Sequence, residues 1–94
     1  MFLIDVTKVR PLDNRELDLT FADGLHAIVA MDRVIEHYSG VFAALMDDSY
    51  FRRVRVDHDL GTIVWPNGAD ICPDVLYSFA SGKPIFINGE RVLN

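Results

Sequence analysis

The stretch RELDLTFADGLHAIVAM, residues 15–31, decides the fold of this chain. In its first half three apolar residues alternate with three polar ones: Leu17, Leu19 and Phe21 against Glu16, Asp18 and Thr20. This period of two predicts a strand with one buried and one solvated face. Asp23-Gly24 then predicts a tight hairpin turn, because both residues tolerate positive φ. Residues 25–31 follow as a further strand, with alternate residues from Leu25 to Met31 on one side.

The segment before this stretch predicts one more strand. In FLIDVTKV, residues 2–9, Ile4 and Val6 can share a face at near-period-two spacing. PLDN, residues 11–14, predicts the turn that follows, because Pro presets φ and Asp and Asn bond back to the backbone. The first third of the chain therefore predicts a three-stranded antiparallel meander.

The period changes at Asp32, which is predicted to be the N-cap of a helix that ends at Gly40. Three residues of that helix have apolar helical spacing: Val34, Ile35 and Tyr38. Two short helical turns are expected in residues 41–48 and 48–53. Four of their side chains are predicted to point inward: Phe42, Leu45, Met46 and Phe51.

The second half predicts a hairpin, a helix and a terminal hairpin. Residues 54–65 form the first hairpin around a polar turn, and Pro73 and Asp74 begin a helix that ends at Gly82. Asn88-Gly89 between two apolar-rich arms is a strong hairpin signal. The fold class is thus α+β. We expect a single domain over residues 1–82 and a C-terminal β-hairpin extension over residues 83–94.

The composition limits the classes of function. Nine basic and 14 acidic side chains give a net charge of −5, which disfavours phosphate backbones and favours a basic partner. The single cysteine, Cys72, cannot form an intrachain disulfide and indicates a reducing, cytoplasmic compartment. No apolar run approaches the roughly 18 residues of a membrane span. The start MFLID lacks the basic region of a secretory signal peptide.

The corner in GTIVWPNGADICPDVLY, residues 61–77, has two interpretations. In the structural one, Trp65-Pro66-Asn67-Gly68 is a β-turn with Pro at the second position, and Asp70 bonds amides near the helix start. In the functional one, three polar side chains converge beside the aromatic face of Trp65 to hold a ligand: Asn67, Asp70 and Asp74. The structural interpretation is preferred, because turn and cap chemistry accounts for each residue.

This corner, with VRPLDNRELDLTFADG (residues 9–24) and GVFAALMDDSYFRRVRVD (residues 40–57), closely resembles the bacterial domain-of-unknown-function family 2442. The resemblance covers about residues 3–80, and residues 65–70 match the family's hallmark without departure. It implies a small α+β domain with no established enzymatic activity. Some relatives carry a C-terminal helix-turn-helix domain, and others are encoded beside a second small protein in the pattern of toxin–antitoxin pairs. The resemblance therefore implies binding rather than chemistry.

Catalytic and metal sites find little support in the residues. The histidines are His26, His37 and His58, and none has the spacing of a compact metal site. Asp57-His58-Asp59 is interpreted as a solvated turn. Cys72 stands at a predicted helix start without an evident histidine partner and is interpreted as an inert thiol. We therefore expect no catalytic residues, no metal and no cofactor.

A short basic cluster is the remaining candidate. If Arg53 and Arg55 lie on one strand, both guanidinium groups leave the same face and can grip a phosphate or a carboxylate. The preferred alternative is an exposed hairpin face neutralised by Asp57 and Asp59. The candidate binding residues are therefore Trp65, Asn67, Asp70, Asp74, Arg53 and Arg55.

The preferred hypothesis is a non-enzymatic protein-interaction module, as the antitoxin-like member of a two-protein system. An acidic domain can cover a small, basic, toxin-like partner by complementary potential. The terminal hairpin can pair with a strand of that partner or with a second copy in a homodimer. Two alternatives stay open: a DNA-associated transcriptional regulator, and a small-ligand-binding domain with its site near Trp65–Asp70.

Overall fold

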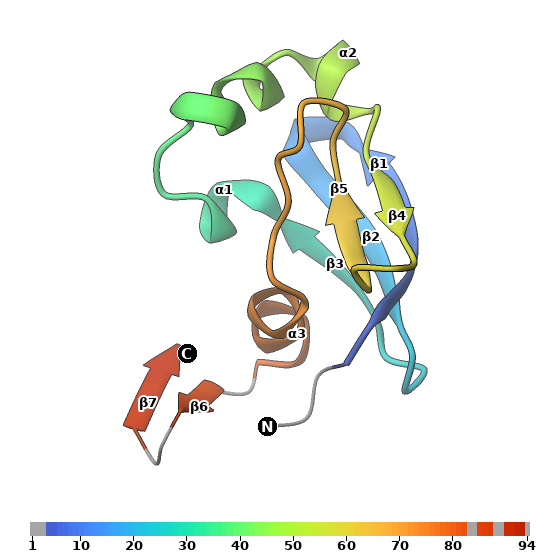
Figure 1. Cartoon of the computed structure of the whole chain (residues 1–94), viewed down its shortest axis with the longest axis vertical. Helices are drawn as coiled ribbons and strands as arrows, with labels where there is room; N and C mark the ends of the chain where they lie inside the picture. Colours follow the sequence, from blue (N-terminus) through green and yellow to red (C-terminus); the bar gives the residue numbers. More distant parts are fainter. Residues whose placement is uncertain (1–3, 83–84, 88–89, 94) are drawn as a thin grey trace.

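The computed structural model describes residues 4–82, 85–87 and 90–93, and the fold is α+β (Figure 1). Its strands are β1 (Val6–Leu12), β2 (Glu16–Phe21), β3 (His26–Ala30), β4 (Arg55–Asp57), β5 (Thr62–Val64), β6 (Ile85–Ile87) and β7 (Glu90–Leu93). Its helices are α1 (Met31–Val34), α2 (Asp48–Phe51) and α3 (Pro73–Ser81), with the 3₁₀ segments η1 (Asp13–Arg15) and η2 (Gly40–Met46). The strands form three antiparallel sheets, β1-β2-β3, β4-β5 and β6-β7.

The predicted meander is confirmed. Leu17, Leu19 and Phe21 of β2 are buried, while the polar residues between them lie on the opposite face. The first turn comes later than predicted, because β1 continues through Pro11 to Leu12. The chain reverses at Asn14 and Arg15, which have φ of 61° and 55°. Two successive positive φ values are the mark of a type I′ turn, whose twist matches that of paired strands.

The helix predicted from Asp32 to Gly40 is wrong in both of its ends. The N-cap of α1 is Ala30, and the helix makes one turn before Ile35 becomes extended. Met31, predicted to end the third strand, is the first residue of α1 and is buried. The carboxylate of Asp32 binds Arg15 across the β1–β2 turn, so it is engaged there and does not cap the helix.

The middle segment is helical, as predicted, but its inward face is smaller. Leu45 of η2 and Phe51 of α2 are buried, and Phe42 is half-buried against the core. Met46 was predicted to point inward and is instead exposed. Asp47 is the N-cap of α2, since its Oδ1 accepts a 3.0 Å hydrogen bond from the backbone N–H of Ser49. The segments η2 and α2 therefore each bury one large apolar side chain.

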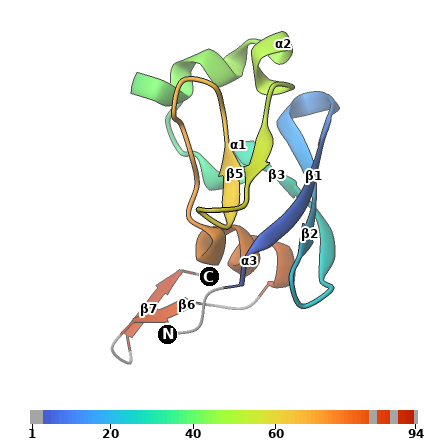
Figure 2. The same cartoon turned by 45° about the vertical axis from the view of Figure 1, so that its right-hand side comes forward.

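One core joins the β1-β2-β3 sheet, the β4-β5 hairpin and the helices. Figures 1 and 2 show η2 and α2 at the upper end of the molecule and α3 at the lower end. The largest fully buried side chains are Trp65, Phe21 and Phe51. The ring of Phe21 meets that of Tyr77 edge to face at 5.1 Å, which seats α3 on the sheet.

Helix α3 has the ends that the sequence predicts. Pro73 is its first residue, and Gly82 closes it in the left-handed conformation with φ of 74°. Strands β6 and β7 follow as an antiparallel pair below α3 (Figure 1). The predicted Asn88-Gly89 turn between them lies outside the described residues.

Candidate functional site

The Trp-Pro-Asn-Gly corner is built around a buried indole. Trp65 is only 1% exposed, and its Nε1 donates a 2.9 Å hydrogen bond to the carbonyl oxygen of Phe51. The rings of the two residues lie 5.9 Å apart, tilted by 45°. The end of β5 is thereby fastened to the end of α2.

The turn itself is closed by backbone and side-chain bonds. The N–H of Gly68 donates to the carbonyl of Trp65 at 3.0 Å, and the N–H of Trp65 donates to the carbonyl of Ala69 at 2.9 Å. Asn67 donates from Nδ2 to the carbonyl of Val41 at 2.8 Å, and its Oδ1 accepts from the N–H of Ala69 at 3.1 Å. Both ends of the Asn67 amide are thus engaged in joining this turn to η2.

The structure does not gather the three polar residues of the functional interpretation. Asp70 is exposed and forms a backbone bridge to Val64, and its carboxylate makes no hydrogen bond within the described ranges. The expected cap contact is therefore wrong: the N-cap of α3 is Cys72, without a side-chain bond. Asp74 lies in the first turn of α3, at the end of the molecule opposite to the corner (Figure 1). Asn67 and Asp74 do not converge, and ligand binding by any of these residues stays a prediction.

The two candidate arginines do not share a strand. Arg53 lies in the turn that follows α2, with its guanidinium 5.6 Å from the ring centre of Tyr50. Arg55 is the first residue of β4, and its Nη1 lies 4.0 Å from Oδ2 of Asp57. The premise of two guanidinium groups leaving one strand face is wrong, whereas the neutralising contact with Asp57 is present.

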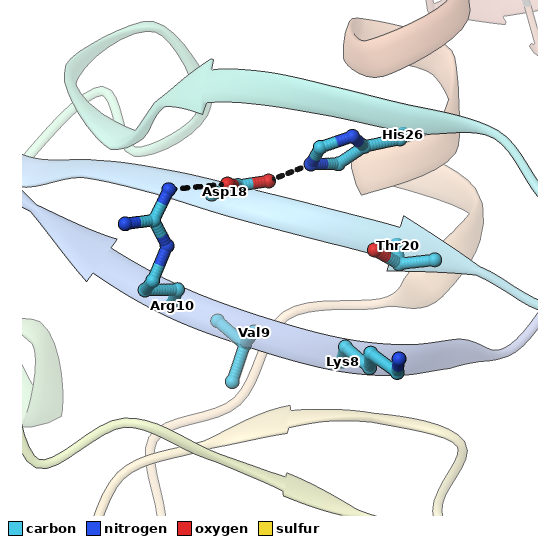
Figure 3. Close-up of a pocket in the computed structure, with 6 residues that line it drawn as sticks. All are labelled: Lys8, Val9, Arg10, Asp18, Thr20 and His26. Carbon is cyan, nitrogen blue, oxygen red and sulfur yellow. Dashed lines mark hydrogen bonds and ion pairs between the residues drawn. The ribbon is translucent and has the colours of Figure 1, made fainter.

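A polar cleft of about 240 Å³ lies on the outer face of the β1-β2-β3 sheet (Figure 3). Six residues line it: Lys8, Val9, Arg10, Asp18, Thr20 and His26. The strand register explains the grouping, because Thr20 pairs with Lys8 on one side and with His26 on the other. Arg10 pairs in the same way with Asp18. The cleft is thus made by three strands that the hairpins bring together.

Asp18 is the electrostatic centre of this cleft. Its carboxylate accepts a 2.9 Å bond from Nη2 of Arg10 and a second bond from Nε2 of His26 (Figure 3). The Asp18 side chain is 12% exposed, against 71% for Arg10 and 63% for His26. The bond from Arg10, and secondarily that from His26, lowers the pKa of Asp18 below its ordinary value. Sequence reasoning missed this cluster, although the alternation in β2 had placed Asp18 and Thr20 on the solvated face.

A second feature gathers charge at the lower end of the sheet. Asp5 lies between two hairpin turns: its carbonyl accepts from the N–H of Ala22 at 2.8 Å, and the next residue, Val6, donates to the carbonyl of Gly61 at 2.9 Å. The N–H of Gly61 donates in turn to the carbonyl of Asp57 at 2.8 Å, so this arrangement brings together three acidic residues, which we call the acidic end: Asp5, Asp57 and Asp59. The one described guanidinium bound to a member is that of Arg55.

The described part of the chain has no feature that supports metal ligation or membrane insertion. Within residues 4–82, 85–87 and 90–93, no group of three or more His, Cys, Asp or Glu side chains could hold a metal ion. No helix of these residues is long and apolar enough to cross a membrane.

Comparison with known proteins places the chain in a family. No curated protein and no solved structure matches it. A family model described as a protein of unknown function, DUF2442, matches residues 6–82. That range runs from the first residue of β1 to the C-cap of α3, so it contains the meander, the corner and the cleft. The chain belongs to the DUF2442 family of proteins of unknown function.

Proposed function

We propose that this chain is a non-enzymatic protein-interaction module, the antitoxin-like member of a two-protein system, and that its partner is a small basic protein. The observation that carries this proposal is the acidic end, where three carboxylates lie together and Arg55 contacts only that of Asp57. The family resemblance implies a two-gene arrangement, and the second small protein of that arrangement is the proposed partner. The net charge of −5 adds to the same potential.

Internal pairing of the basic residues strengthens this potential. Arg10, Arg15 and Arg52 each bind a carboxylate away from the acidic end, so none of them pairs with its carboxylates. Asp59 at the β4–β5 turn is exposed and makes no ion pair among the described residues. A basic partner that approaches this end meets complementary potential, which raises the association rate and fixes orientation.

Copurification at low salt with the product of the neighbouring gene tests the proposal. The double variant Asp5→Asn with Asp59→Asn removes two charges from the acidic end and keeps the side-chain shape. Glu36→Gln with Asp70→Asn removes two exposed charges elsewhere. The first variant is expected to weaken the complex by about fivefold to tenfold, since exposed pairs each contribute less than about 1 kcal/mol.

Two results would overturn the proposal. Absence of any complex at low salt removes the interaction with that partner. Equal weakening by both double variants shows that total charge governs binding, and removes the acidic end as the contact surface.

A further inference from the structure

We propose that the outer face of the β1-β2-β3 sheet is a carboxylate-binding site, centred over Thr20 between Lys8 and His26. This site lies in the cleft of Figure 3 and is separate from the acidic end. It does not depend on the interaction module proposed above, because a different set of residues carries it.

The register of the sheet places the donors in one row. Lys8 is opposite Thr20 in the β1–β2 ladder, and Thr20 is opposite His26 in the β2–β3 ladder. Side chains directly opposite each other on one face have Cβ atoms about 4.5–5.5 Å apart. The Thr20 hydroxyl is therefore flanked by an ammonium group on one side and an imidazole on the other. A carboxylate above Thr20 can accept hydrogen bonds from the ammonium group and the hydroxyl, while the His26 ring, whose Nε2 is bound to Asp18, borders the site on the other side.

Several donors of the cleft are still available. Lys8 is exposed, and neither its ammonium group nor the Thr20 hydroxyl makes a hydrogen bond within the described residues. Arg10 uses Nη2 toward Asp18, which leaves further N–H groups of its five-donor guanidinium. Asp18 also binds the His26 ring through Nε2, so it orients both side chains across the sheet.

The charge and size of the cleft favour a carboxylate over a phosphate. Lys8 and Arg10 against Asp18 leave one net positive charge when His26 is neutral. A singly charged carboxylate balances this charge, whereas a dianionic phosphate brings one negative charge in excess. The volume of about 240 Å³ lies below the roughly 300 Å³ at which drug-sized pockets begin. It suits a small organic acid or one acidic side chain of a peptide.

The assignment is tested by titrating the full chain with ligands and monitoring the chemical shifts of its backbone amides by NMR. Three probes are added separately: acetate, a glutamate-rich peptide and inorganic phosphate. We expect saturable shifts at residues 8, 10, 18, 20 and 26 with at least one carboxylate probe. Binding of acetate alone identifies a free acid as the source of the carboxylate, and binding of the peptide identifies a partner segment.

A matched pair of variants tests the role of the row. Lys8→Ala removes a flanking cation, while Arg53→Ala removes a cation outside the cleft, so both variants lose the same charge. Lys8→Ala is expected to weaken carboxylate binding about fivefold, with Arg53→Ala within about twofold of the parent chain. Equal weakening by both variants would overturn the site. So would absence of saturable shifts, or tighter binding of phosphate than of both carboxylate probes.

Discussion

The indole Nε1 of Trp65 donates a 2.9 Å hydrogen bond to the carbonyl oxygen of Phe51, the last residue of α2. Both side chains are fully buried, so this bond is shielded from water. It connects the β4-β5 hairpin to the helical layer at the last carbonyl of α2, which also accepts a 3.3 Å hydrogen bond from the N–H of Val54. The corner is therefore a joint between two parts of the core.

Trp65→Phe is expected to lower the free energy of unfolding by about 2–3 kcal/mol, because it removes indole volume and the shorter of the two hydrogen bonds that the Phe51 carbonyl accepts. Urea denaturation followed by far-ultraviolet circular dichroism measures the change. A variant as stable as the parent chain would show that the bond to Phe51 contributes nothing to the joint.

Asn67→Ala is expected to cost about 1–2 kcal/mol, since the Asn67 amide holds both the Val41 carbonyl and the Ala69 N–H. Asp70→Asn in the same exposed turn is the matched control, and its effect should stay within about 0.5 kcal/mol. Thermal or urea unfolding compares the two. An equal cost for both changes would contradict a specific role of Asn67 in the joint.

Gly61→Ala is expected to destabilise the fold more than Gly24→Ala. Both glycines have positive φ, of 71° and 92°, so each substitution carries a backbone cost of about 1 kcal/mol. A Cβ on Gly61 would also crowd the carboxylate of Asp5, an exposed side chain that must turn aside at a small additional cost, while a Cβ on Gly24 meets open space. The difference in unfolding free energy between the variants measures the crowding, and adding Asp5→Ala to Gly61→Ala should reduce it.

Stability is expected to fall between about pH 10 and pH 12 as Tyr38 ionises. Burial, together with the hydrogen bond that Tyr38 donates to Asp32, raises its pKa from 10.0 to about 12. Because the folded state holds the phenol proton more tightly, this contribution is complete below pH 10 and is lost as the pH rises through 12. Denaturant unfolding at several alkaline pH values measures the loss.

Two phenylalanine variants isolate the tyrosine responsible. Tyr38→Phe should show a smaller alkaline loss than the parent chain. Tyr50→Phe removes a hydroxyl that makes no hydrogen bond among the described residues, so it should leave the loss unchanged. The pKa of Tyr77 is raised by its bond to Asp23, so part of the alkaline loss of stability remains in both variants. Identical alkaline profiles for all three chains would contradict the assignment to Tyr38.

The sequence predicts most strongly those elements whose signals are local. The alternation of Leu17, Leu19 and Phe21 predicted β2, and Pro73 with Gly82 predicted both ends of α3. The prediction of a helix over residues 32–40 was wrong because the geometry of this segment depends on a distant residue. Asp32 binds the guanidinium of Arg15 at 2.8 Å and 3.1 Å, and no pattern within residues 32–40 contains that information.

The dependence on local or distant residues also explains why the corner was predicted from the sequence and the cleft was not. The corner could be recognised from contiguous residues, and its turn chemistry follows from Pro66, Asn67 and Gly68. To predict the cleft, one would have to know that Lys8 pairs with Thr20 and Thr20 with His26, and these pairs depend on strand register. A one-residue change in register would send each side chain to the other face. Spacing along the chain alone does not supply that register.

Trp65 is the single tryptophan of the chain, and it is enclosed where β5 meets α2. Its fluorescence therefore reports the integrity of the interior and lies apart from both proposed binding surfaces. A ligand on the outer sheet face or a protein at the acidic end should leave the emission maximum in place, whereas opening of the joint should shift it toward the red. One optical signal can thus separate variants that lose binding from variants that lose their fold.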